Sequence, residues 1–327
     1  MVGNMKLDVQ AFTGDRRGQD DPRVWIGLDI GGTKIAAAKA DAEGIIQQLV
    51  RERTRKATPE ELLGQIVSVV EQLLAPADEL VSVGIGLPGQ VDPEAGHTFS
   101  PYNLGWPNVV QIRKPLQERF GVPVFIDNDL NTAIIAELTQ GVGRTNKNFC
   151  YVTVGTGVAA GLVFDGKLFR GAHHLAGELG HVVVDPTARD CVCGAKGCLE
   201  ALVSGPAIAR SYNEVVGMES GVATAEKVFS AARQGDAAAL AVVRDTAKYL
   251  AIGINNLAAL VDPEVVTIGG GVSDAGDILF SHLEEALKRW LSGVVDKRVE
   301  IRPATYGSKT GVIGSLMLAY ANHLQAV

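Results

Sequence analysis

The chain has 327 residues, only four of them cysteines, and a formal net charge of −7. At about 150 residues per domain this length predicts two domains, each able to bury its own core. The modest negative charge disfavours a nucleic-acid partner. No apolar run reaches the roughly 18 residues of a membrane span, and the polar start lacks the apolar centre of a signal peptide. We therefore expect a cytoplasmic protein without membrane contact.

The first part of the chain predicts a tail followed by three strands. Residues 1–23 show no periodicity and mix Gly, Asp and Arg, which is typical of a disordered polar tail. Folding is expected to begin with the apolar strand Val24–Ile30. Tight turns then separate it from a small-residue strand ending at Ala40 and from a third strand, Ile45–Val50.

The next segment predicts helices alternating with buried strands. Pro59–Leu74 is amphipathic and starts like a helix, because Thr58 is a capping residue and Glu60 faces the positive end of the helix dipole. Periodicity further predicts strands at Val81–Ile85 and Val122–Ile126, and helices near Ile112–Phe120 and Asn131–Gln140.

A second copy of the opening unit then appears. Phe149–Val154 and Val158–Phe164 predict two antiparallel strands, and Asp165 with Gly166 predicts a hairpin turn into a third strand, Lys167–Phe169. The same order of strand, Gly and Thr turn, small-residue strand and acidic-Gly turn occurs over Leu28–Ile46. This internal echo predicts two related halves.

The rest of the chain completes the second half. Periodicity predicts helices at Gly205–Val215, Thr224–Arg233, Asp236–Val261 and Asp277–Leu291, with strands at Val265–Ile268 and Val299–Pro303. A last apolar helix, Gly311–Leu324, is expected to pack back onto the first half. We thus expect an N-terminal α/β domain over 24–138, joined by a helix at 312–327, and a C-terminal α/β domain over 139–311.

The first candidate phosphate site lies where one strand turns into the next. It contains Asp29, Gly31, Gly32, Thr33 and Lys34. Two glycines let the backbone approach a phosphate, while the exposed amides and the Thr hydroxyl supply donors. The preceding carboxylate is suited to holding Mg²⁺ through water. The alternative is a tight hairpin whose glycines serve only positive φ angles.

Two further glycine groups strengthen the phosphate interpretation. The echo of the first turn consists of Gly155, Thr156 and Gly157. Two such hairpins can grip a polyphosphate from both sides. A third cluster follows the strand Val265–Ile268 and precedes a helix; it consists of Gly269, Gly270 and Gly271. Glycines there can admit a flat nucleoside, or can simply end a strand.

A dinucleotide-binding motif is spelled out by Gly84, Gly86 and Gly89 after a strand. However, Pro88 lies inside the pattern, and the following residues have no helical period. No helix N-terminus is therefore available for a pyrophosphate, which disfavours a dehydrogenase.

The candidate catalytic group is Asp129, at the expected C-terminal end of a strand and just before a helix. Ligands bind at such ends in open α/β sheets. A hydroxyl becomes nucleophilic when a carboxylate accepts its proton, and Asn128 offers a donor and an acceptor to neighbouring hydroxyls. The alternative role is helix capping by Asp129 or Asn131.

A candidate metal site follows in the second half. Its ligands are His181, Cys191, Cys193 and Cys198. Three thiolates and one imidazole complete a tetrahedral zinc shell with no open position, so the predicted ion is structural. A disulfide between two of the cysteines is the alternative, and a cytoplasmic chain disfavours it. Glu178 and Glu200 flank the cluster, which suggests carboxylates fixed for hydroxyl recognition; each would otherwise be a solvated charge.

These motifs together resemble the ROK family of sugar kinases and repressors. The resemblance rests on DIGGTK, on the Asn128–Asp129 pair, on GELGH at 177–181 and on CVCGAKGCLE at 191–200. It implies a two-domain, actin-like ATPase fold of ribonuclease H-like type, with duplicated halves and a cleft between them. It also implies a homodimer or higher homo-oligomer.

The resemblance also implies individual roles. Asp129 would be the catalytic base. The sugar contacts would be Asn103, Asn128, Asp129, Glu178, His181 and Glu200. Asn103 belongs to a segment, Asn103–Trp106, similar to that of the bacterial glucokinase branch. One departure is the second turn, which continues as Val158, Ala159 and Ala160 where family members often carry more glycines, so nucleotide affinity or donor choice is expected to differ.

The sequence thus predicts an ATP-dependent hexose kinase, using Mg²⁺ and a structural Zn²⁺, that phosphorylates the 6-hydroxyl of glucose. Other hexoses remain open as substrates: N-acetylmannosamine, N-acetylglucosamine, mannose or fructose. A non-catalytic sugar-sensing regulator is a further alternative. The polar residues 1–23 are too few and too irregular for the helix-turn-helix domain of the family's repressors, which favours the enzyme.

Overall fold

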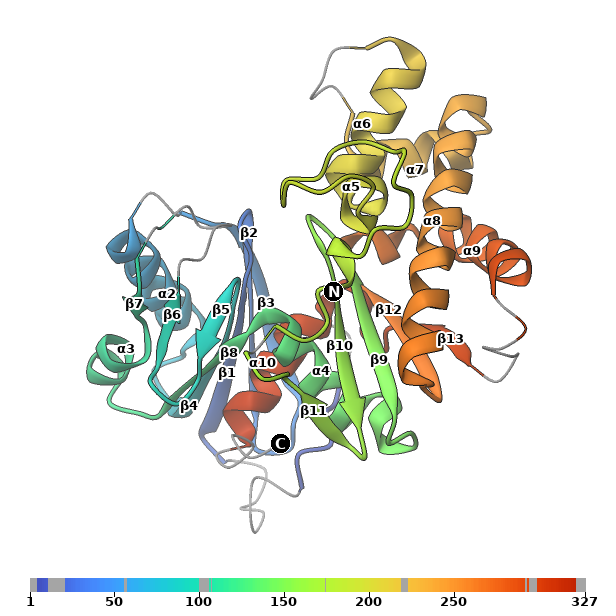
Figure 1. The fold of residues 1–327 in the computed structure, drawn as a ribbon. Coiled ribbons are helices and arrows are strands. Elements are labelled where there is room, and N and C mark those ends of the chain that lie inside the picture. The colour runs from blue at the N-terminus through green and yellow to red at the C-terminus, as the bar shows by residue number, and fades with distance from the viewer. Residues whose placement is uncertain are drawn as a thin grey trace. The chain divides into compact units, whose positions relative to one another are not determined.

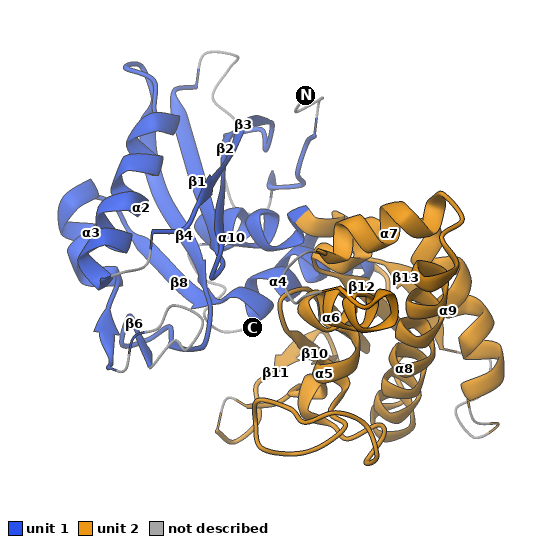
Figure 2. Ribbon diagram, turned by 90° about the horizontal axis from the view of Figure 1, so that it is seen from above, with its two compact units in different colours: residues 1–144, 309–327 blue, residues 145–308 orange. Residues whose placement is uncertain are grey.

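The computed structural model describes residues 5–10, 21–55, 58–99, 106, 108–173, 175–218, 223–291, 293 and 299–321. The chain forms two compact units, residues 1–144 with 309–327 and residues 145–308 (Figure 2). The sequence placed these boundaries at 138/139 and 311/312. The first boundary falls later because the short 3-10 helix η2 (Val142–Arg144) is held to the preceding helix by Glu137, whose carboxylate accepts from Val142 N at 3.2 Å.

Unit 1 is built on a five-stranded sheet in the order β3-β2-β1-β4-β8. Strands β1, β4 and β8 run parallel, while β2 and β3 are antiparallel to their neighbours. The strands are β1 (Arg23–Ile30), β2 (Lys34–Asp41), β3 (Ile46–Arg53), β4 (Glu79–Leu87) and β8 (Val124–Asn128).

The two faces of this sheet have different coverings. Alternate β1 residues, Ile26 and Leu28 among them, pack in one core with Leu62 and Ile66 of α2 (Pro59–Leu73) and with α3 (Arg113–Phe120). The opposite face is covered by α10 (Thr310–Tyr320), which packs on β1, β4 and α4 (Asp129–Gln140) (Figure 1).

Small residues let α10 lie against the sheet. A Cβ on Gly84 would come within 2.0 Å of the Ser315 carbonyl oxygen, and one on Gly86 within 2.7 Å of Thr132 Oγ1. Gly89 is followed by strand β5 (Gln90–Asp92), so no helix follows the dinucleotide-like motif. These glycines serve helix packing.

A small sheet not predicted from the sequence follows β4. It consists of β5, β6 (His97–Phe99) and β7 (Val110–Gln111), in antiparallel order. These strands are only two or three residues long and lie in a Pro- and Gly-rich stretch. They are therefore too short to show the alternation of apolar and polar residues that predicts a strand.

Part of the expected N-terminal tail is packed. Leu7 and Val9 are 1% and 2% exposed, and Leu7 N donates to the Gly44 carbonyl oxygen at 2.8 Å. The side-chain amide of Gln140 pairs with both backbone groups of Asp8, at 2.8 and 2.9 Å. The prediction of a loose tail is therefore wrong for residues 5–10, which bury two apolar side chains.

Unit 2 repeats the sheet of unit 1. The order is β11-β10-β9-β12-β13, with β9, β12 and β13 parallel and β10 and β11 antiparallel. The strands are β9 (Phe149–Val154), β10 (Val158–Phe164), β11 (Lys167–Phe169), β12 (Val265–Gly269) and β13 (Glu300–Pro303). The predicted duplication is therefore present in strand order and direction.

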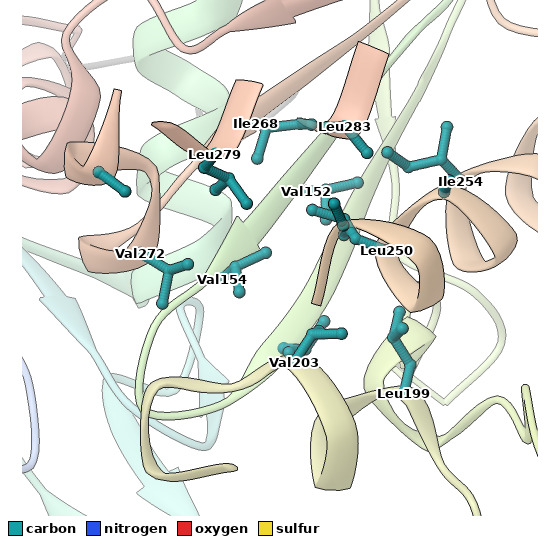
Figure 3. Close-up of a cluster of buried hydrophobic side chains, with 14 of the residues drawn as sticks. Val152, Val154, Leu199, Val203, Leu250, Ile254, Ile268, Val272, Leu279 and Leu283 are labelled. Atoms are coloured by element: carbon teal, nitrogen blue, oxygen red, sulfur yellow. The ribbon is translucent and has the colours of Figure 1, made fainter. Parts of the chain in front are cut away.

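Helices cover the unit 2 sheet and enclose its core. They are α5 (Leu199–Val203), α6 (Gly205–Val216), α7 (Ala225–Arg233), α8 (Ala237–Val261) and α9 (Asp277–Trp290), with short 3-10 helices η3 (Leu179–His181), η4 (Gly271–Ala275) and η5 (Gly307–Lys309). Val152 and Ile268 of the sheet pack with Leu250 and Ile254 of α8 (Figure 3). Within the described residues, no helix has the length and apolar character needed to cross a bilayer.

Candidate functional site

Asp129 occupies the junction between β8 and α4. The helix is capped by Asn128, whose Oδ1 accepts from Leu130 N at 2.9 Å and from Asn131 N at 3.4 Å. Asn128 Nδ2 donates to the Gly89 carbonyl oxygen at 2.7 Å. The capping role therefore belongs to Asn128, and Asp129 is left in the first turn with its Oδ1 accepting from Leu130 N at 2.9 Å. Asp129 is thus placed at the strand end without being the cap.

The electrostatics of unit 1 favour a proton acceptor at this point. Burial, and then the negative charge of Asp29, raise the pKa of Asp129 from 3.8 to about 7. Burial also raises the pKa of Asp29 to about 6, opposed by the charges of Lys34 and Arg51. A carboxyl group with a pKa near neutrality is matched to general-base catalysis at that pH.

Asp29 lies at the end of β1, on the sheet face covered by α10. A Cβ on Gly311, in the first turn of that helix, would come within 2.6 Å of Asp29 Oδ2. The position therefore excludes a side chain, and it holds the carboxylate against the positive end of the helix dipole. Sequence reasoning missed Gly311; a glycine in the first turn of a predicted helix was the available signal.

The turn after β1 exposes its backbone. Gly31 N donates to the Lys34 carbonyl oxygen at 2.8 Å, and Thr54 Oγ1 donates to the Gly31 carbonyl oxygen at 2.7 Å. Thr33 and Lys34 are exposed. Neither Gly31 nor Gly32 is among the glycines with positive φ. The hairpin explanation based on positive φ therefore fails for these two glycines.

The second turn, Gly155–Gly157, joins β9 to β10 in unit 2. Gly155 N donates to the Gly157 carbonyl oxygen at 2.9 Å, and Gly155 O accepts from Gly205 N at 2.7 Å. Gly205 begins α6, which is capped by Ser204. The turn thus adjoins a helix N-terminus, a place where backbone amides bind phosphate. Ser204 followed by Gly and Pro is a sequence signal for this helix N-terminus, and sequence reasoning did not connect it with the phosphate turn.

The third glycine cluster meets the second turn. A Cβ on Gly155 would lie 3.8 Å from Gly271 N. Gly270 has φ +83°, and a Cβ on it would reach the Val154 carbonyl oxygen at 2.4 Å. A Cβ on Gly269 would collide with the hydroxyl of Tyr151. The structure therefore brings the two glycine groups of unit 2 to one place.

The departure from the family's glycine-rich pattern falls in a strand. Val158, Ala159 and Ala160 belong to β10 and pair with Val154, Thr153 and Val152 of β9. Side chains at these positions fit the pleat of the sheet, and the turn itself keeps both of its glycines.

His181, Cys191, Cys193 and Cys198 converge in one cluster. Their ligand atoms all lie within 4.8 Å of one another, with Cys191 Sγ 3.7 Å from His181 Nδ1 and Cys193 Sγ 3.6 Å from Cys198 Sγ. These separations match the edges of a tetrahedral shell with metal bonds of about 2.0–2.3 Å. All four cysteines of the chain are free thiols, which argues against the disulfide alternative.

The loop around the cluster has its own support. Cys191 N donates to the Ala195 carbonyl oxygen at 2.8 Å, and Gly194 N donates to Cys191 O at 3.0 Å. Gly197 has φ +70°, and a Cβ there would meet the Asp185 carbonyl oxygen. Only glycine fits this backbone. The residues present thus fit a zinc ion in chemistry and in spacing.

The two glutamates beside the cluster differ in their surroundings. Glu178 is 55% exposed, with its Oε2 3.9 Å from His181 Nε2. Glu200, in α5, accepts from Val158 N at 3.0 Å. Asn103, the remaining predicted sugar contact, lies outside the described residues.

Paired ribonuclease H-like sheets, glycine turns after the first strand of each, and an aspartate at a strand end define a phosphotransferase of the actin-like ATPase class. The chain belongs to the ROK family, whose sequence model matches residues 25–322. It is 36% identical to a glucokinase of Halalkalibacterium halodurans over 89% of this chain and 93% of that one. It is 33% identical to an N-acetylmannosamine kinase of Yersinia pseudotuberculosis, over 91% and 98% of the two chains. A ROK glucokinase of Streptomyces griseus, solved with glucose and AMPPNP, superposes with a TM-score of 0.79 at 32% identity, covering 90% of this chain and 99% of that one.

Proposed function

We propose that this chain is an ATP-dependent kinase that phosphorylates the 6-hydroxyl of glucose, with Asp129 as the general base. The observation that carries the proposal is the position of Asp129 at the start of α4 with a pKa raised to about 7. Support for glucose comes from glucokinase relatives that span most of the chain at 34–36% identity. Support for ATP comes from the related glucokinase structure that contains AMPPNP.

In the proposed reaction Asp129 accepts the proton of the 6-hydroxyl as that oxygen bonds to the γ-phosphorus. The bond from that phosphorus to the bridging oxygen breaks, and ADP leaves. The transition state of such transfers is loose, so the protein contributes alignment and charge neutralisation. In each of the turns Gly31–Lys34 and Gly155–Gly157 the first amide already donates within the turn, and amides that follow it would supply donors to the phosphates. Asp29 would hold Mg²⁺ through water, and that ion would supply neutralisation of the phosphate charge.

We also propose that Asn103, Asn128, Glu178, His181 and Glu200 contact the sugar. Asn128 is fixed beside the proposed base, because its Oδ1 caps α4, its Nδ2 donates to the Gly89 carbonyl oxygen, and its side chain also hydrogen-bonds to Asp129. His181 and the three thiolates would hold the proposed zinc ion, with His181 Nδ1 lying 3.7 Å from Cys191 Sγ, and the other ring nitrogen of His181 would then be available to the sugar. The closed ligand set gives the ion a structural role.

A second candidate substrate is N-acetylmannosamine, because a kinase for that sugar is 33% identical to this chain. The deciding experiment is a panel of glucose, N-acetylmannosamine, N-acetylglucosamine, mannose and fructose, with ATP and polyphosphate as donors. The expected result is the highest kcat/KM for glucose with ATP. A higher kcat/KM for another sugar would reassign the substrate. ATP turnover unchanged by every sugar would favour a sugar-sensing regulator.

A further inference from the structure

One carboxylate of unit 2 touches the candidate phosphate turn directly. Glu200 Oε2 accepts from Val158 N, the first amide after the turn, at 3.0 Å. A Cβ on Gly157 would lie 2.8 Å from the same oxygen. The turn therefore needs glycine at this position so that the carboxylate can approach it.

The helix that carries Glu200 is fixed in the core. Leu199 and Val203 of α5 point into the cluster that contains Leu250 (Figure 3). Leu199 N also donates to the Val182 carbonyl oxygen at 3.0 Å, which ties the helix to the metal-binding loop. Glu200 therefore presents its carboxylate from a rigid support.

The residues that follow this helix also contact the turn. Ser204 N donates to the Glu200 carbonyl oxygen at 3.2 Å, and Gly205 N, the next residue, donates to Gly155 O at 2.7 Å. The turn is thus held at its first residue by Gly205 at the start of α6 and just after its last residue by the Glu200 side chain. A displacement of Glu200 displaces the amides between them.

The GELGH segment, residues 177–181, packs against both Val158 and Glu200. A Cβ on Gly180 would meet the Val158 carbonyl oxygen at 2.2 Å and Glu200 Cβ at 3.2 Å. Ala160 N donates to the Gly177 carbonyl oxygen at 2.7 Å. Strand β10, the GELGH segment and α5 are therefore in close contact beside Glu200, with no room for a side chain at Gly180.

We infer that Glu200 is a positioning residue for the Gly155–Gly157 turn, and that it couples sugar binding to nucleotide binding. The inference rests on the proposed function, in which Glu200 also contacts the sugar. One carboxylate oxygen is bonded to Val158 N, and the other accepts a sugar hydroxyl. A sugar that bonds to Glu200 fixes the carboxylate, which fixes the turn amides for the phosphates. By linkage the nucleotide strengthens sugar binding by the same factor.

The test measures Mg²⁺·AMPPNP binding to the full chain by calorimetry, with and without glucose. For the unaltered chain, glucose is expected to tighten AMPPNP binding at least about fivefold. Glu200→Ala should weaken AMPPNP binding without glucose about tenfold, as expected from losing one hydrogen bond to a charged group, and should abolish the effect of glucose. Glu200→Gln keeps an acceptor for Val158 N and should restore most of the glucose-free affinity.

Glu178→Gln is the matched control, because Glu178 is also a proposed sugar contact but faces His181. It should raise the KM for glucose and leave AMPPNP binding without glucose unchanged. Zinc content and thermal unfolding verify that each variant is folded. If Glu200→Ala does not fold, Glu200→Gln decides, since a neutral acceptor should at least halve the effect of glucose on AMPPNP affinity.

Two outcomes overturn the inference: glucose-free AMPPNP affinity in folded Glu200→Ala equal to that of the unaltered chain, or an undiminished glucose effect in both variants. The proposed function fails in a different way, by the absence of glucose phosphorylation in the unaltered chain. A chain that phosphorylates glucose while Glu200→Ala binds AMPPNP normally retains its proposed function and loses only the coupling.

Discussion

Asp29 at the end of β1 and Asp129 at the start of α4 interact through their charges: burial raises the pKa of Asp129 to about 7, and Asp29 contributes to that rise. Two buried carboxylates of like charge cannot both ionise freely. Asp29 has the lower pKa, about 6, and is therefore the first to ionise. This order agrees with the proposed roles, in which Asp29 holds the metal and Asp129 accepts the proton.

Replacing Asp129 by Asn should lower kcat by about 10²-fold or more, because the proton acceptor is lost. Glucose affinity should change little, since the amide keeps the shape and the hydrogen-bonding reach of the carboxylate. A coupled assay for ADP release gives kcat, and calorimetry gives the glucose Kd. Turnover close to that of the unaltered chain would remove Asp129 from the mechanism, whereas loss of glucose binding would indicate a positioning role.

The same variant should be more stable than the unaltered chain at neutral pH. The folded-state pKa of Asp129, about 7, lies above its usual value of 3.8, so the folded state binds the proton more tightly than the unfolded state. The associated stability is fully present below about pH 3.8 and is lost as the pH rises through 7. Asp129→Asn stays neutral and does not lose it. Its advantage in Tm should therefore grow between pH 4 and 7 and then level off.

Thermal unfolding from pH 4 to pH 8 measures this difference. Asp127→Asn is the comparison variant, because Asp127 is also buried and its Oδ1 accepts from Asn131 Nδ2 at 2.8 Å. A Tm difference between Asp129→Asn and the unaltered chain that is constant across the range would show that Asp129 has an ordinary pKa in the folded state.

The protein purified without chelator should contain about one zinc ion per chain. Cys193→Ser should lose the ion and show a lower Tm, because zinc binding contributes on the order of 10 kcal/mol to such loops. Cys150→Ala is the control: Cys150 is buried in β9, away from the four-ligand cluster, and its variant should retain zinc. Elemental analysis measures both. Zinc-free protein from the unaltered chain would exclude the site.

Sequence patterns predicted the parts of the fold that repeat or alternate over many residues. The hairpin signal at Asp165–Gly166 and the strand Phe149–Val154 agree with β9, β10 and β11. The echo of the first turn predicted the shared strand order because a repeated pattern carries its topology with it. The four candidate metal ligands also converge as predicted, since the three cysteines lie close together in one loop, which limits the possible arrangements.

Local alternatives could not be resolved in the same way. Asn128, Asp129 and Asn131 are all good capping residues, and the choice of Asn128 depends on its extended backbone, with φ −64° and ψ 146°. Leu7 and Val9 alternate with Lys6 and Asp8, but two apolar residues are too short a pattern to distinguish a strand from a tail. The backbone between them pairs with Gln140, which is 132 residues away from Asp8.

The contact of Gly84 with α10 could not be predicted from the sequence either, because Ser315 lies far from Gly84 along the chain. This contact can be tested with a matched control. Gly84→Ala would place a Cβ within 2.0 Å of the Ser315 carbonyl oxygen and 2.7 Å of Ala319 N. Both atoms belong to helix backbone and cannot rotate away, so the expected loss is about 2 kcal/mol or more. The backbone of Gly84 does not have positive φ, so the contact alone is measured.

Gly64→Ala is the control for this substitution. Gly64 lies exposed within α2, and a Cβ there meets nothing within 4 Å. Alanine favours a helix interior over glycine, so a gain of up to about 1 kcal/mol is expected. Urea unfolding of both variants gives the free energies. Equal stabilities would mean that α10 does not rest on β4 through Gly84, whereas opposite signs would establish that glycine at this position serves helix docking and not a dinucleotide.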